Sequence, residues 1–124
     1  MDEWRLSLER REMAKRFPRF QLKAMSGGFL AWHGSVSTIF GYNHNLTLVY
    51  PPDYPYSAPV AFAEERLRPG TPHIYNNGAL CTHTPQEWDS NCTVVTATGW
   101  AAAWFHAYDS WRHTGEWVGK ELQH

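Results

Sequence analysis

Cysteine is scarce in this chain, with Cys81 and Cys92 as the only two among 124 residues. So few cysteines exclude a disulfide-rich secreted scaffold, which uses several bridges to hold a small chain together. In a reducing compartment two cysteines are reactive, metal-binding or buried more often than bridged, although a Cys81–Cys92 disulfide stays open at this point. Any thiol chemistry of the chain therefore belongs to these two side chains.

Long apolar runs are also missing from the sequence. No stretch approaches the ~20 consecutive apolar residues that a membrane-spanning helix needs. The first residues lack the charged-then-apolar order of a signal peptide. The sequence therefore predicts no membrane partner and a cytoplasmic location.

An excess of charge of one sign is absent too. The formal net charge is −1 and charged residues make up 19% of the chain, which argues against long disordered tracts and against a nucleic-acid partner. One basic cluster near the start is either a solvated helix face or a surface for an acidic partner. It consists of Arg10, Arg11, Lys15, Arg16 and Arg19.

Aromatic residues are plentiful, with seven Trp, six Tyr and six Phe in a chain that is 43% hydrophobic. This is enough apolar material for a real core. A length of 124 residues falls within the usual size of one domain. We therefore expect a single domain over residues 1–124.

The hydrophobic pattern predicts an α+β fold. Residues 2–17 read as a helix that Asp2 caps and Pro18 ends. Its apolar face is expected to contain Trp4, Leu6, Leu8, Met13 and Phe17. Four strands with short polar turns between them predict an antiparallel meander. They cover residues 20–25, 29–37, 44–50 and 60–63, and in the third Leu46, Leu48 and Tyr50 share one face.

The second half of the chain contains two irregular segments and one long helix. Residues 50–59 hold four prolines and are expected to be an ordered connection packed by tyrosine rings. Residues 67–91 show no sustained period and predict a long loop, a kind of segment that is often functional. A second helix is predicted from a Thr93 cap to a stop near Gly115. Its buried stripe is Val94, Ala97, Ala101, Trp104, Tyr108 and Trp111.

Cys81 lies on the long loop, between His73 and His83. One interpretation is a small buried residue, since free cysteine is often buried. Another is a reachable nucleophile whose thiolate is favoured by a nearby imidazolium. Asn76, Asn77 and Gly78 either shape the loop around it or form only a turn. A zinc site of Cys81, Cys92, His73 and His83 and a thiol hydrolase stay open, although the ligand spacing lacks the short pairs of structural zinc sites.

Two motifs together resemble the ubiquitin-conjugating enzyme family. The segment YPPDYPYSAPV, residues 50–60, is similar to the family's tyrosine-proline segment. Gly78, Ala79, Leu80 and Cys81 fill the pattern around the family's nucleophilic cysteine, and Trp88 follows it as in the family. The resemblance covers roughly residues 4–112. It implies a UBC-like fold with a helix, a four-stranded meander, an active-site loop and a helix on the sheet.

The departures from the family pattern point to a divergent prokaryotic branch. Thr71-Pro72-His73 stands in place of His-Pro-Asn, so His73 occupies the position of the Asn that supports the loop and the oxyanion. His83 replaces an aspartate after the cysteine, and the later helices of the family are truncated. These features are most similar to the conjugating enzymes of CBASS antiphage operons, which accompany a cGAS/DncV-like nucleotidyltransferase.

The resemblance implies a mechanism without cofactor or metal. Cys81 would accept the C-terminal glycine carboxyl of a protein partner as a thioester, with the nucleotidyltransferase or a bacterial ubiquitin-like protein as that acyl donor. The acyl group would then pass to an amine on a protein target, after loading by an activating enzyme. His73 would be an oxyanion donor or loop organiser, and His83 would tune the thiolate or deprotonate the amine. The alternative is a binding module without chemistry.

Overall fold

The computed structural model describes residues 1–119 and opens with a capped helix. Helix α1 spans Glu3–Arg16, and the side chain of Asp2 accepts a hydrogen bond from the backbone N–H of Arg5 at 2.8 Å, as predicted. The expected apolar face is only partly correct. Trp4 is 75% exposed, whereas Glu9, a charged residue of the same helix, is fully buried.

Four strands follow and form one antiparallel sheet in the order β1-β2-β3-β4, which confirms the predicted meander. They span Gln21–Ala24, Leu30–Ser37, Asn43–Val49 and Val60–Ala63. The register places Leu48 opposite both Trp32 and Ala61. Leu46, Leu48 and Tyr50 are all buried, so the face predicted for the third strand is the one that faces the core.

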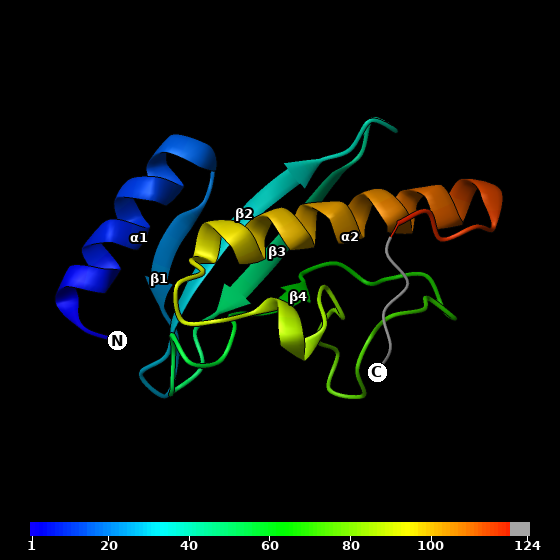
Figure 1. Ribbon diagram of the computed structural model, residues 1–124. Coiled ribbons are helices and arrows are strands. Elements are labelled where there is room, and N and C mark those ends of the chain that lie inside the picture. Colours follow the sequence, from blue (N-terminus) through cyan, green and yellow to red (C-terminus); the bar gives the residue numbers. More distant parts are fainter. Residues whose placement is uncertain (120–124) are drawn as a thin grey trace.

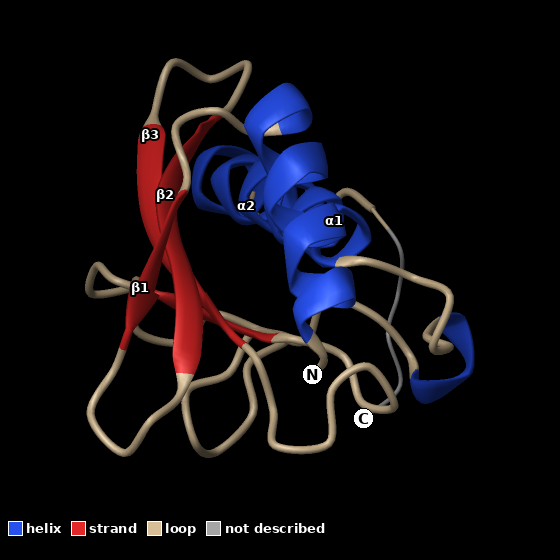
Figure 2. Ribbon diagram, turned by 90° about the vertical axis from the view of Figure 1, so that its left-hand side faces the viewer, coloured by secondary structure: helices blue, strands red, loops and turns tan. Residues whose placement is uncertain are grey.

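Helix α2 covers this sheet. It spans Val94–Thr114, begins at the Thr93 cap and ends at Gly115, whose φ of 81° is the left-handed conformation that glycine adopts readily. Figure 1 shows α2 running across the sheet, with α1 beside it. Figure 2 shows both helices on the same side of the sheet, so the molecule has two layers. Neither described helix is long and apolar enough to cross a bilayer.

The core lies between the sheet and the helices. Of the predicted α2 stripe, all members are buried except Trp111, which packs at the margin. The proline segment, residues 50–59, is ordered by the packing of its aromatic rings, as expected. Tyr54 is 3% exposed and its ring centroid lies 4.6 Å from that of Tyr50 and 5.8 Å from that of Trp88. Tyr56, in contrast, is exposed.

The buried Glu9 joins α1 to the rest of the molecule. Its carboxylate accepts hydrogen bonds of 2.8 Å from the hydroxyls of Tyr50 and Tyr54, and one of 3.2 Å from the N–H of Val94 at the start of α2. Arg5 pairs with the same carboxylate at 3.3 Å. Burial, reinforced by the Glu9 carboxylate, raises the pKa of Tyr50 far above its usual value, so its hydroxyl stays protonated and donates.

A second polar cluster lies under the other end of α2. The buried carboxylate of Asp109 accepts hydrogen bonds from the Thr38 hydroxyl and the Arg112 guanidinium, each at 2.5 Å. His44 Nε2 lies 2.9 Å from both of its oxygens. Burial acts to raise the pKa of Asp109, but the hydrogen bonds from Thr38, His44 and Arg112 outweigh it and hold that pKa below its usual value.

Candidate active site

A short hairpin holds the cysteine loop against β4. Ile74 pairs with Leu80, and the N–H of Tyr75 donates to the carbonyl of Ala79 at 2.9 Å. The N–H of Leu80 donates to the carbonyl of Ala61 in β4 at 2.8 Å. The predicted loop over residues 67–91 is therefore more regular than expected, because these backbone bonds are invisible to side-chain periodicity. It also contains the short 3-10 helix η1, Pro85–Glu87.

The tip of this hairpin is a tight turn through Asn76, Asn77 and Gly78. The N–H of Gly78 donates to the carbonyl of Tyr75 at 2.9 Å, and Gly78 has a φ of 89°. The Asn77 side chain accepts a hydrogen bond from the N–H of Ala79 at 3.0 Å. Because all three turn residues are exposed at the tip, they shape the loop and do not face the thiol from within the core.

Cys81 follows the hairpin directly and is buried. Its N–H donates to the carbonyl of His73 at 2.9 Å, and the residue is only 1% exposed. Burial raises the pKa of the Cys81 thiol, and a hydrogen bond with the Tyr75 side chain acts in the opposite direction. The expectation that Cys81 is reachable is therefore wrong for the free protein.

His73 organises the loop through its main chain. It has a φ of 59°, in the left-handed region. Its carbonyl accepts hydrogen bonds from both the Cys81 N–H and the indole N–H of Trp104, the latter at 3.1 Å. Its ring packs against the ring of Trp117 at 4.9 Å. This geometry connects the cysteine loop to α2 and to the C-terminal segment, residues 115–119.

His83 lies on the other side of Cys81, against α2. Its ring stacks on Trp100 at 4.5 Å, and its Nδ1 lies 3.0 Å from the Thr82 hydroxyl. Burial lowers the pKa of His83, opposed by the charge of Glu87, so the imidazole is largely neutral at neutral pH. A neutral imidazole does not stabilise a thiolate electrostatically, but it can accept a proton.

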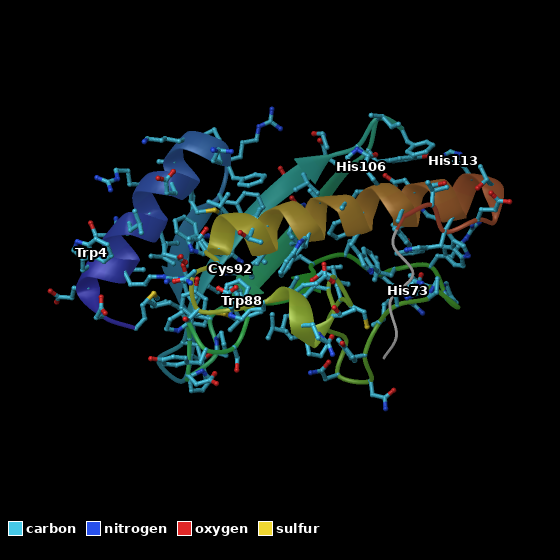
Figure 3. All side chains as sticks on the ribbon, in the orientation of Figure 1. Trp4, His73, Trp88, Cys92, His106 and His113 are labelled. Carbon is cyan, nitrogen blue, oxygen red and sulfur yellow. The ribbon has the colours of Figure 1, made fainter. Side chains whose placement is uncertain are left out.

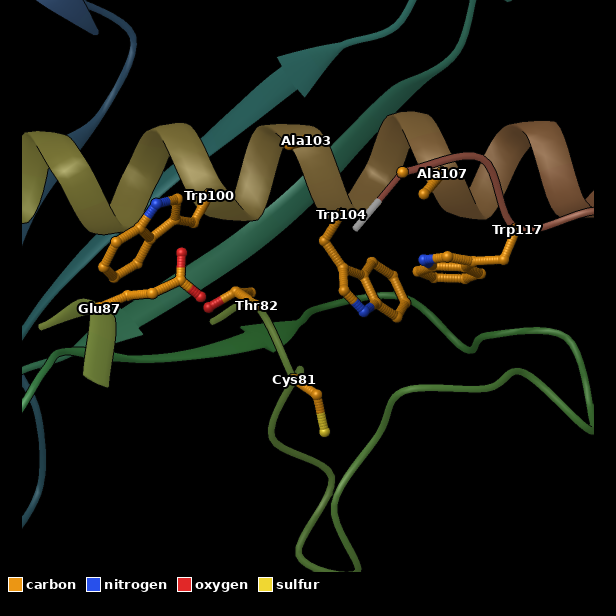
Figure 4. Close-up of a pocket in the computed structure, with 9 residues that line it drawn as sticks. Cys81, Thr82, Glu87, Trp100, Ala103, Trp104, Ala107 and Trp117 are labelled. Carbon is orange, nitrogen blue, oxygen red and sulfur yellow. The ribbon is translucent and has the colours of Figure 1, made fainter. Parts of the chain in front are cut away.

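Two cavities lie beside this group. One, of about 200 Å³, is bounded by Cys81 and Thr82 on one side and by Trp100, Trp104 and Trp117 on the other (Figure 4). The other, of about 300 Å³, is bounded by the proline segment together with Tyr75 and His83. Cys81 and Tyr75, which are hydrogen-bonded to each other, thus belong to different cavities, and so do Thr82 and His83, which are neighbours in the chain.

The zinc alternative finds no support in residues 1–119. Within that range no three His, Cys, Asp or Glu side chains converge on a common point. Figure 3 shows Cys92 beside the start of α2, apart from His73 on the loop. Cys81 and Cys92 are both free thiols, and the Sγ of Cys92 makes a long contact of 3.9 Å with the carbonyl of Glu87.

Sequence reasoning missed Tyr75 and three tryptophans of the site. Tyr75 follows His73 by two residues, and strand residues two apart share a face. In a hairpin with Ile74 opposite Leu80, the side chain of Tyr75 is a diagonal neighbour of Cys81. A prediction of the strand register in this hairpin would have identified Tyr75 as a neighbour of Cys81. The helix period predicts only that Trp104 packs against the sheet, and no sequence pattern indicates that Trp100 or Trp117 borders the cysteine.

The architecture defines the class of protein. The fold is similar to the crystal structure of a ubiquitin conjugating enzyme E2 from Plasmodium falciparum, with a TM-score of 0.58 and 16% sequence identity. The match covers 82% of this chain and 95% of that one. The fold is thus UBC-like, as the proline segment and cysteine loop predicted.

The sequence defines the family within that class. Residues 9–124 match the family described as Type II CBASS E2 protein. The chain belongs to this family, and the resemblance to CBASS-associated conjugating enzymes is confirmed. No sequence among curated proteins matches the chain.

Proposed function

We propose that this E2-like protein is a cysteine acyl transferase. Cys81 attacks the activated C-terminal glycine carboxyl of a protein partner, the activating group leaves, and a thioester forms on Sγ. An amine of a target protein then attacks the thioester carbonyl, the Cys81 thiolate leaves, and an amide results. The activated donor comes from a separate activating enzyme. The observation that supports this most directly is the position of Cys81, which lies at the base of an ordered hairpin and borders the cavity beside α2.

The donor is proposed to be a cGAS/DncV-like nucleotidyltransferase with a C-terminal glycine. The family match to Type II CBASS E2 proteins supports this choice over a bacterial ubiquitin-like protein, which stays as the alternative cargo. Two free thiols are consistent with work in the cytoplasm of a prokaryotic cell.

His83 is proposed to receive the proton of the incoming amine. Its neutral imidazole borders the cavity that opens beside Tyr75 and the proline segment. A neutral imidazole can take up a proton, which is what this step requires of a general base. Replacing His83 with Asn should therefore slow transfer to the amine about tenfold or more while thioester formation stays near normal. Equal loss of both steps would contradict a role in proton transfer.

His73 is proposed as the loop organiser. Its carbonyl fixes the Cys81 N–H, whereas its ring packs on Trp117. Hydrogen-bond donors of the loop then stabilise the oxyanion once the acyl-donor protein is bound. Alignment of the thioester with the amine supplies most of the rate acceleration.

The test is a covalent adduct on Cys81. The chain is incubated with the nucleotidyltransferase and the activating enzyme, then resolved on gels with and without reductant. We expect a reductant-sensitive adduct that disappears in Cys81→Ala and becomes reductant-resistant in Cys81→Ser. Cys92→Ala is the matched control and should form the adduct normally. An adduct that persists on Cys81→Ala would refute the assignment.

The second candidate function is a binding module without chemistry. The burial of Cys81 favours it, since a buried thiol cannot react without a conformational change. In that case Cys81→Ala would support phage protection as well as the parent chain.

A further inference from the structure

The cavity beside Cys81 has a wall of alternating indole rings and methyl groups. Trp100, Ala103, Trp104 and Ala107 lie on one stripe of α2, because residues three and four apart share a helix face. Ala103 leaves room between the two indoles, Ala107 leaves room between Trp104 and Trp117, and Cys81 with Thr82 forms the facing wall (Figure 4). A space of about 200 Å³ with this lining fits one large apolar side chain next to the thiol.

The C-terminal segment, which here means residues 115–119, borders this same cavity through Trp117 and Gly119. Gly115 reverses the direction of the chain, and the Ser110 hydroxyl donates to the carbonyl of Glu116 at 3.3 Å. The segment then places the ring of Trp117 at 5.2 Å from that of Trp104. A methyl group on Gly119 would lie 3.7 Å from that of Ala107, so the backbone itself approaches the helix.

This arrangement explains how a loop cysteine comes to be enclosed. Trp117 and Gly119 both border the cavity that Cys81 borders, and Trp117 also packs against the ring of His73. Acylation needs the carboxyl carbon of the donor within bonding reach of the Cys81 Sγ. A donor tail that enters along α2 would meet the segment that already lies there.

The side chains of this segment are also of the kind that a donor tail would need to fill an apolar cavity. It presents a large aromatic side chain, then Val118, which is 62% exposed, and then a glycine close against the helix. The donor of the proposed reaction ends in glycine, and Gly119 is the glycine of this segment, although here the chain continues to His124. The polar cavity bordered by His83 fits the incoming amine better, which leaves the apolar one for the tail.

We propose that the cavity between Cys81 and α2 binds the C-terminal tail of the acyl donor, and that Trp117-Val118-Gly119 occupies this site in the free protein. The tail that it takes carries a large apolar side chain two positions before its terminal glycine. This inference rests on the proposed function, since it assumes that an acyl donor comes to Cys81. The C-terminal segment must leave before the donor can enter.

The first test measures access to the thiol in the whole chain. In a Cys92→Ala background, only Cys81 reacts with iodoacetamide. Trp117→Ala should increase the alkylation rate about tenfold or more, because local opening of the segment exposes the site. Trp117→Phe should restore most of the protection. Trp4→Ala, which removes an exposed indole from α1, is the matched control and should leave the rate unchanged. An unchanged rate in Trp117→Ala would overturn the proposal.

The second test asks what the cavity prefers. The chain is ended after Gly115, and its fold is checked by far-ultraviolet circular dichroism. The peptide Glu-Trp-Val-Gly with a free carboxylate should slow alkylation of Cys81 at about 1 mM, a concentration suited to weak peptide binding. The peptide Glu-Ala-Val-Gly should not. If the shortened chain fails to fold, the same peptides are added to the Trp117→Ala chain.

Equal protection by both peptides, or none by either, would refute the apolar preference. These alkylation experiments require no donor, so their failure is separate from that of the proposed reaction. Suppose that the thioester is lost in Cys81→Ala but the alkylation rate is unaltered in Trp117→Ala. The proposed acyl-transferase function would then stand, and the proposed tail-binding site would be refuted.

Discussion

At the residue scale, the chemistry of Cys81 is set by two opposing influences. Burial raises the pKa of its thiol, and the hydrogen bond with Tyr75 counteracts that effect by favouring the thiolate. The rings of the two histidines that flank Cys81 in the sequence pack on tryptophans. His83 stacks on Trp100, and the ring of His73 packs on Trp117. Sequence reasoning found the nucleophile candidate but missed Tyr75 beside it, because contacts across a hairpin depend on register.

Tyr75→Phe tests this balance. Loss of the hydroxyl removes a hydrogen bond to the charged form, so the thiolate should form only at higher pH and alkylation of Cys81 at neutral pH should slow about tenfold. The measurement is the pH profile of iodoacetamide alkylation in the Cys92→Ala background. The control is Tyr56→Phe, which alters an exposed tyrosine on the cavity that Tyr75 borders. Identical profiles for both variants would show that Tyr75 has no effect on the thiol.

At the element scale, the predicted helices and strands agree with the structure almost throughout, since they depend on periods of apolar residues. The Thr93 cap and the Gly115 stop delimit α2 as expected. What periodicity could not show are the polar contacts between elements. Glu9 reads as a surface residue of α1, yet it is buried where three segments meet: α1, the proline segment and the start of α2.

The hairpin before Cys81 depends on one unusual backbone conformation. His73 has a positive φ, which asparagine tolerates better than alanine does. We therefore expect His73→Asn to keep most of the thioester formation and stability, and His73→Ala to lose about 1 kcal/mol or more of folding stability. Urea unfolding and adduct formation, measured on both variants, check this. A His73→Asn chain as impaired as His73→Ala would show that the imidazole itself is needed.

At the scale of the whole molecule, two polar clusters tie the ends of α2 to the other elements. Glu9 binds its start to α1 and the proline segment, and Asp109 binds its last turns to β3 and the chain after β2. The four residues of α2 that border the Cys81 cavity lie between these two clusters. The site is thus formed on a helix that is fixed at both ends, which favours a constant distance between its indoles and the thiol.

Asp109→Asn should make stability less dependent on pH. The folded-state pKa of Asp109 is lowered, so its contribution to stability is present above the pKa of the unfolded chain and is lost as the pH falls through the folded pKa. At neutral pH the variant should lose about 3 kcal/mol, since one partner of a buried ionic network is removed. Urea unfolding at about pH 7 and about pH 3 measures the difference.

The difference in stability between parent and variant should narrow toward acid pH, because the contribution of the Asp109 carboxylate is lost as the pH falls through its folded-state pKa. Glu3→Gln, at an exposed position, is the control and should change stability by less than about 0.5 kcal/mol. A gap that stays constant over the same pH range would contradict a charged Asp109.

The contact between Trp117 and Trp104 has an optical consequence. Two indoles at 5.2 Å in an edge-to-face arrangement, with the His73 ring 4.9 Å from one of them, are expected to contribute to the near-ultraviolet circular dichroism of the chain. Departure of Trp117 from Trp104 should reduce that contribution and change the tryptophan fluorescence, and the Trp117→Phe chain should lack both changes. The chain therefore contains its own reporter, with which the arrival of a partner at the cysteine can be followed in real time without any attached dye.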